Sequence, residues 1–155
     1  MKAKITVVLI VIVSMIVSLL VWNSLNEQAL MKCRVNAVIS IGDVRLYSVI
    51  SYDMKNMRGV IAMDGYIETP EQPPLRVRRK ILVDYTRNAH QFMMKSYHYE
   101  VSEYDNAGDK LAQMKLMPDF YTRPDQQFTM IIIPQGGNYV LQTTSIFPTF
   151  YCYTY

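Results

Sequence analysis

The sequence predicts a mainly β protein, in which an N-terminal transmembrane helix precedes an antiparallel β-barrel or strongly curved sheet of about eight strands with one short helix. Three observations lead to this fold class. An apolar segment near the start is long enough to cross a bilayer, polar and apolar residues alternate through most of the remaining chain, and one late segment has helical spacing. Because successive strands are joined by turns, an antiparallel meander is favoured.

The first element is the apolar segment from Ile5 to Trp22, which contains no charged residue. A helix of that length covers about 27 Å, close to the ~30 Å hydrocarbon core of a bilayer. Lys2 and Lys4 precede it, whereas the next cation is Lys32, and this asymmetry predicts a cytoplasmic N-terminus and an exported remainder. A cleaved signal peptide is the alternative, but its apolar region is shorter and ends in small residues. An uncleaved anchor is therefore the preferred interpretation.

The predicted division is a cytoplasmic tail at 1–4, the transmembrane helix at 5–22, a linker at 23–30 and an exported β domain at 31–155. The β domain is long enough for one core. Once Lys2 and Lys4 are set aside, 14 lysines and arginines face 13 aspartates and glutamates. This near-neutral balance and the exported location exclude nucleic acid as a partner of the domain.

Eight segments have the alternation and the β-branched and aromatic residues of strands. They are 32–41, 44–52, 60–67, 76–85, 91–103, 128–133, 139–147 and 150–155. Asp64-Gly65 is a candidate bulge, and Gly136-Gly137-Asn138 predicts a tight turn. The proline-rich stretch 69–74 is predicted as a loop, because proline cannot donate a hydrogen bond to a strand ladder.

Two strands show where the pattern is informative. In 76–85, the residues of the apolar face are Val77, Ile81, Val83 and Tyr85, and Arg79 is a cation in phase with them. In 91–103, the apolar residues set among polar ones are Met93, Tyr97, Tyr99 and Val101. The helical spacing occurs in 109–117, where Asp109 is the expected N-cap and Pro118 ends the helix.

The two cysteines, Cys33 and Cys152, lie at opposite ends of the exported region. In an oxidising compartment an even pair predicts a disulfide, and a closed barrel would bring the first and last strands together. Two buried free thiols are the alternative. Metal binding is not expected, because neither the cysteines nor His90 and His98 have the spacing of metal ligands.

No enzymatic motif occurs in the sequence. It lacks a nucleophile elbow, a zinc-protease helix, a paired-cysteine redox motif and a phosphate-binding glycine loop. We therefore expect neither an enzyme nor a cofactor. His90 and His98 are interpreted as surface or structural histidines.

Most of the chain carries a resemblance to a known family, and the most specific part of this resemblance is the closing segment. The features that occur in order are Cys33 just after the anchor, the basic strand LRVRRKILVDY (75–85), the segment MPDFYTRPDQQFTMIII (117–133) and the segment GGNYVLQTTSIFPTFYC (136–152). This resembles the FidL-like family of enterobacterial single-pass membrane proteins. The resemblance implies a bacterial inner-membrane protein with a periplasmic domain that is a lipocalin-like barrel.

The resemblance also implies a function. FidL-like proteins are similar to ToxS and VtrC, the small partners of ToxR-like and CadC-like membrane-bound winged-helix transcription regulators. We therefore expect this chain to associate with a regulator's periplasmic domain, to stabilise or modulate it, and to share a bile-salt-like ligand pocket with it. A self-sufficient membrane-anchored carrier barrel for a lipid-like ligand is the alternative.

Arg79 is the one residue that the sequence singles out for a ligand site. An unpaired guanidinium inside a barrel is costly, so it should meet a carboxylate. That carboxylate belongs either to an amphipathic ligand or to an Asp or Glu of this protein or its partner, and the protein carboxylate is the preferred interpretation.

Overall fold

The computed structural model describes residues 10–21, 31–70, 72–143 and 148–155. A helix occupies 10–21, and within the described residues no helix has the length and apolar character needed to cross a membrane. The predicted anchor Ile5–Trp22 extends beyond this helix at both ends, into residues 1–9 and 22–30, which lie outside the described part, as does the predicted linker.

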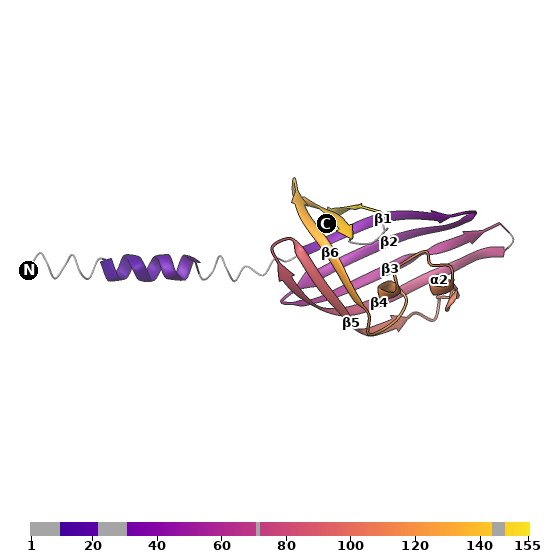
Figure 1. The fold of residues 1–155 in the computed structure, drawn as a ribbon, viewed down its shortest axis with the longest axis horizontal. Coiled ribbons are helices and arrows are strands. Elements are labelled where there is room, and N and C mark those ends of the chain that lie inside the picture. Colours follow the sequence, from indigo (N-terminus) through magenta and orange to yellow (C-terminus); the bar gives the residue numbers. More distant parts are fainter. Residues whose placement is uncertain (1–9, 22–30, 71, 144–147) are drawn as a thin grey trace, which may run out of the picture.

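Eight antiparallel strands form a closed barrel in the order β1-β2-β3-β4-β5-β6-β7-β8 (Figure 1), which confirms the predicted fold class at that level. The strands are β1 Met31–Ile41, β2 Val44–Lys55, β3 Arg58–Thr69, β4 Gln72–Asn88, β5 Gln91–Val101, β6 Gln127–Gln135, β7 Asn138–Thr143 and β8 Phe150–Thr154. A short helix α2, Lys110–Gln113, and a 3-10 turn η1, Asp119–Tyr121, lie between β5 and β6.

Alternation along the strands sorts side chains between the interior and the solvent. In β1 the predicted inner residues Cys33, Val35, Ala37 and Ile39 are all buried, and the intervening residues are exposed. β4 buries Val77, Ile81, Val83 and Tyr85 in the same way. The sequence pattern therefore predicted which face of these strands forms the core.

The proline-rich stretch is not entirely a loop, which corrects the prediction for 69–74. β4 already begins at Gln72 and so includes Pro73 and Pro74. Its pairing with β3 is irregular there, and β5 pairs with β4 only from Arg79 onward. These prolines therefore lie where no regular ladder requires their missing N–H group.

Asp64-Gly65 is not a bulge, because β3 stays in register with both neighbours through these residues. Gly65 has a different role. A Cβ at this position would overlap the carbonyl oxygen of Tyr47 in β2, so glycine allows the two strand backbones to approach closely where the sheet bends.

One strand and the predicted helix depart from a regular pattern. In β5, Phe92, Met94 and Ser96 are buried, whereas Met93, Tyr97 and Val101 are exposed. A register shift opposite Leu82 and Val83 leaves Tyr97 as an extra residue and changes the inward phase. The helix predicted over 109–117 is reduced to the four residues of α2, and the side chain of Asp109 makes no capping hydrogen bond.

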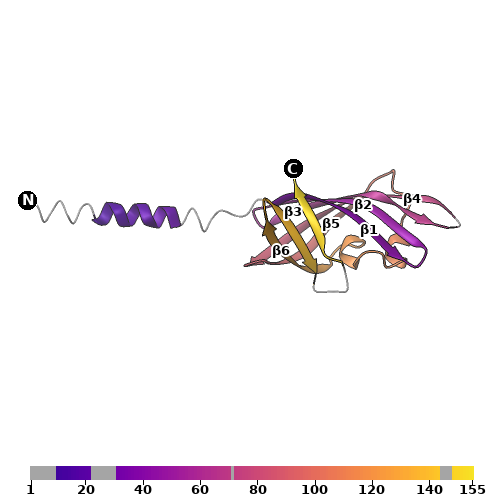
Figure 2. The same ribbon diagram turned by 90° about the horizontal axis from the view of Figure 1, so that it is seen from above.

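The barrel is closed unevenly. β5 pairs with β6 at residues 91–95 alone. The segment 102–126 begins beside β4, with backbone hydrogen bonds to Arg76 and Arg78, and continues to a groove that it shares with β1. Figures 1 and 2 show α2 toward the end of the barrel where β1 turns into β2. Leu111, Leu116, Phe120 and Tyr121 of this segment are buried and fill the interior.

Candidate interaction site

Beyond Arg34, the edge of β1 that faces β8 has no strand-ladder partner in the described part of the chain. β2 pairs with β1 along its whole length, whereas β8 pairs with it at Cys33 and Arg34. A strand edge without a neighbour presents N–H and C=O groups that another chain can bind as an added strand. This edge is therefore a candidate docking site.

A groove of about 730 Å³ lies beside the same edge. Its apolar lining comes from β1, from the segment 102–126 and from the residues just before β8, and consists of Val38, Ile39, Ile41, Ala112, Leu116, Met117, Pro118 and Pro148. Lys115, Asp119 and Arg123 add charged groups to the lining. An apolar surface with cations in its lining can bind the apolar side chains of a partner strand or an amphipathic anion.

The groove wall formed by 102–126 is fastened to the barrel through Arg79, which is 5% exposed. Its Nε donates to Asp105 Oδ2 at 2.7 Å, and its second Nη group donates to Asp105 Oδ1 at 3.3 Å and to the Gly108 carbonyl at 2.6 Å. The other Nη group donates to the Tyr99 hydroxyl at 2.6 Å. The carboxylate that meets Arg79 thus belongs to this chain, and the ligand role of Arg79 stays a prediction.

Asp105 is equally enclosed, and its side chain is 0% exposed. Besides Arg79, it accepts hydrogen bonds from the backbone N–H groups of Arg78, Ala107 and Gly108. Burial alone would raise the pKa of Asp105, but the hydrogen bonds from Arg79 and Arg78 outweigh it, so the pKa lies below its usual value. The loop after β5 is thereby held on β4 by a charged and satisfied cluster.

A second buried contact fixes η1 inside the barrel. The hydroxyl oxygens of Tyr52 and Tyr121 are 3.0 Å apart, and both rings are buried. Tyr99 connects the two contacts, since its hydroxyl donates to the Tyr121 carbonyl at 3.3 Å. Burial raises the pKa of Tyr52 to about 12 although the hydrogen bond with Tyr121 lowers it, and burial raises the pKa of Tyr121 well above its usual value.

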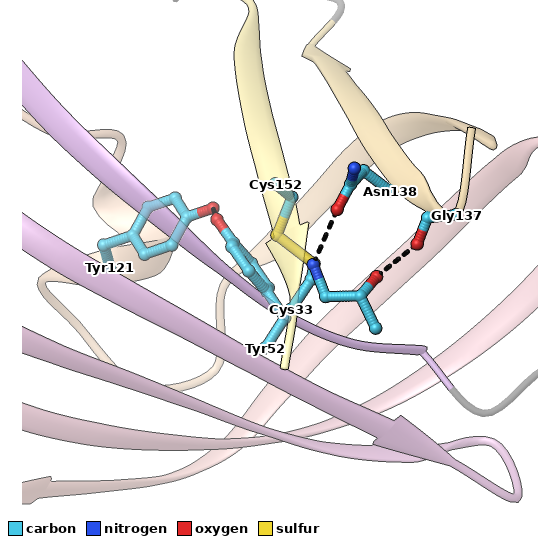
Figure 3. Close-up of a disulfide and its surroundings, with 7 residues drawn as sticks. Cys33, Tyr52, Tyr121, Gly137, Asn138 and Cys152 are labelled. Atoms are coloured by element: carbon cyan, nitrogen blue, oxygen red, sulfur yellow. Dashed lines mark hydrogen bonds between the residues drawn. A yellow bond between two sulfur atoms is a disulfide. The ribbon is translucent and has the colours of Figure 1, made fainter. Parts of the chain in front are cut away.

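The Cys33–Cys152 disulfide joins β1 to β8 next to this tyrosine pair (Figure 3). The Cα atoms are 5.4 Å apart, as predicted for first and last strands that meet. Thr154 ties β8 to its other neighbour, because its N–H donates to Asn138 Oδ1 at the start of β7 and its hydroxyl donates to the Gly137 carbonyl. The β1–β8 seam is thus held by a covalent bond at Cys33, next to the last β1 residue that pairs with β8.

We expect Tyr52 to ionise after the exposed tyrosines when the pH is raised. Because its pKa is raised in the folded state, its contribution to stability is complete below about pH 10 and is lost as the pH rises through about 12. Tyrosinate absorbance of the wild type should therefore show a late component that coincides with unfolding. The late component of the absorbance should be smaller in the Tyr52→Phe variant. Ionisation of all tyrosines in one early step would contradict this assignment.

Sequence reasoning found Arg79 and both cysteines but missed the residues that complete the two buried contacts. Asp105 was not singled out, and Tyr52, Tyr99 and Tyr121 were not distinguished from the other tyrosines. One signal was present: a cation on the inner face of β4 requires a carboxylate nearby, and Asp105 follows the adjacent strand β5. His98 lies on the surface, with Nε2 3.5 Å from Glu100.

Fold and site together define a small antiparallel barrel whose seam is closed by a disulfide, with an apolar groove beside the part of β1 that lacks a ladder partner in the described chain. The model of the YqeJ C-terminal domain family matches residues 30–152, and the chain belongs to this family. Searches of curated proteins and of solved structures each found no match. The family match does not concern the FidL-like proteins, so that resemblance stays a prediction.

Proposed function

We propose that this chain is a non-enzymatic partner of a membrane-bound winged-helix transcription regulator in the bacterial inner membrane. The segment Ile5–Trp22 anchors it, the N-terminus is cytoplasmic, and the lipocalin-like barrel is periplasmic. The regulator's periplasmic domain binds along the open edge of β1 and is stabilised by it. The resemblance to FidL-like proteins supports this role.

One observation of the structure carries the proposal: among residues 31–70, 72–143 and 148–155, the β1 edge has no ladder partner beyond Arg34, and it adjoins an apolar groove. Backbone pairing along the edge would supply affinity, and the groove would receive apolar side chains and so supply specificity. Val38, 61% exposed, lines this groove from β1.

The membrane anchor is supported by the described helix itself. Its isoleucines, leucines and valines are exposed, with Leu20 at 64%. A helix that is apolar and exposed on every face is stabilised when its side chains are buried in lipid, because this removes them from water as packing in a protein core would.

The carrier alternative is less well supported, because the barrel interior is filled. Tyr52, Met63, Phe120 and Met94 are among the large side chains that are completely buried there. A bile-salt-like ligand is better accommodated in the groove, where Lys115 and Arg123 could meet its anionic group. We assign Arg79 a structural role in holding the groove wall.

Lysine substitutions at Val38 and Ile41 should weaken binding to the regulator at least tenfold without unfolding the barrel. Both side chains are exposed, and inserted charge opposes strand addition at an edge. Affinity for the purified periplasmic domain of the candidate winged-helix regulator is the measurement, followed by the abundance of that regulator in cells. Val60→Lys on the outer face of β3 is the control. Equal binding by all three proteins, or unchanged regulator level and output after deletion of the chain, would refute the proposal.

A further inference from the structure

The end of the barrel that contains Met31 exposes apolar side chains from several elements. Register places the β2–β3 turn and the last residues of β8 at this end, because Met31 pairs with Met54 and Cys33 pairs with Thr154. The exposed apolar residues there include Met57 at 46%, Tyr153 at 54% and Tyr155 at 56%.

Met57 is in an unfavourable backbone conformation for its residue type. It has φ +61° at the tip of the turn, after Asn56 at +54°, where glycine is the usual residue at the second position. The tip is held in place, because the Met57 carbonyl accepts a hydrogen bond from the Tyr85 N–H at 2.9 Å. A strained position that nevertheless keeps a long apolar side chain in solvent indicates a role for that side chain.

The same end is basic. Its cations are Lys32, Lys55, Arg58, Arg87 and Lys95, and its side-chain carboxylates are Asp53 and Asp84. The segment 102–126 toward the other end has the opposite balance, with five aspartates and glutamates against three lysines and arginines. The barrel therefore has a positive end, and that end is the one at which the chain enters.

Chain connectivity keeps this end near the predicted anchor. From Trp22 to Met31 the chain advances nine residues, which span at most about 32 Å when fully extended. Tyrosine at the level of the headgroups and lysine or arginine near anionic lipid are the typical features of a surface that contacts a bilayer.

We propose that the basic end of the barrel, including Met57, Tyr153 and Tyr155, rests on the anionic lipid headgroups of the bilayer. Met57 and the tyrosines enter the interfacial layer, and the cations lie against lipid phosphates. This inference rests on the membrane anchorage in the proposed function. It orients the barrel so that the β1 edge near Val38 and Ile41 points away from the bilayer and stays accessible to a partner.

The test uses the full chain reconstituted in vesicles of phosphatidylcholine, with or without phosphatidylglycerol. A photoreactive benzoylphenylalanine replaces Met57 or Tyr153, or Val38 as the control at the opposite end, and lipid adducts are measured by mass spectrometry. A charge variant, Lys55→Glu with Lys95→Glu, is compared with Lys110→Glu and Lys115→Glu in the segment 102–126.

We expect lipid adducts at Met57 and Tyr153 to exceed those at Val38 several-fold in vesicles with phosphatidylglycerol. They should fall several-fold in phosphatidylcholine alone, at high salt and in the Lys55/Lys95 variant, but not in the Lys110/Lys115 variant. Two results overturn this inference alone if the chain still resists carbonate extraction. One is an equal yield of lipid adducts at both ends of the barrel, and the other is adducts to another protein chain in place of lipid. Extraction by carbonate overturns the anchorage as well.

Discussion

Loss of the Cys33–Cys152 disulfide is expected to lower the free energy of unfolding by about 4 to 5 kcal/mol, because the bond closes a loop with a sequence separation of 119 residues. Domains of this size are usually stable by about 5 to 15 kcal/mol, so the reduced protein should be close to unfolding at physiological temperature. The effect should be large for a structural reason too, since β8 pairs with β1 at two residues only within the described chain.

Urea unfolding of the full chain in detergent, followed by the near-ultraviolet circular dichroism of the tyrosines, measures this loss. The single tryptophan, Trp22, precedes the barrel and would not report on it. The Cys33→Ser, Cys152→Ser double variant and the chemically reduced wild type should be destabilised alike. A difference of less than about 1 kcal/mol between oxidised and reduced wild type would show that the strands hold the seam without the bond.

Asp105→Ala is expected to destabilise the barrel by about 3 to 5 kcal/mol, because it leaves the buried guanidinium of Arg79 without its counter-charge. Arg79→Met should cost less, since the Asp105 carboxylate keeps three backbone N–H donors. Urea unfolding of the two variants measures these losses. A larger loss of the free energy of unfolding for Asp105→Ala than for Arg79→Met indicates a cluster organised around the carboxylate. Equal losses would indicate a simple ion pair.

The pH dependence of the free energy of unfolding gives an independent check on the role of Asp105. The pKa of Asp105 is lowered by folding, so its stabilisation is present above the unfolded pKa near 4 and is lost as the pH falls through the lower folded value. The difference in the free energy of unfolding between wild type and Asp105→Asn should therefore become smaller as the pH is lowered. Glu100→Ala is the control, because its pair with Lys80 is half exposed and should contribute less than about 1 kcal/mol. Equal losses for Glu100→Ala and Asp105→Ala would contradict this account.

Much of the fold could be predicted from the sequence where local rules are sufficient. Alternation in β1 and β4 identified the inner face, the Gly136-Gly137 turn was recognisable from residue type, and the cysteine pair followed from an even count and a barrel that closes. Each of these depends on residues close together in the chain or on a single topological fact.

Errors occurred where a residue's environment is set by a distant segment. The prolines of β4 are tolerated because β5 ends opposite Arg79, and β5 changes phase because of a register shift with β4. The helix at 109–117 is shortened to four residues, and its segment fills the space between two strand edges. Periodicity within one strand contains no information about where its neighbour ends.

The sequence by itself determined that the chain from Met31 onward is an antiparallel β structure, which faces of its strands are apolar, and that Arg79 needs a carboxylate. Only the tertiary structure decided that Asp105 provides it, that Tyr52 meets Tyr121, and that a groove lies beside the part of β1 that has no ladder partner among the described residues of β8. The physical reason is the range of the interactions: backbone alternation is set by neighbours two residues apart, whereas Tyr52 and Tyr121 are 69 residues apart. Contacts of that kind depend on how the whole barrel closes.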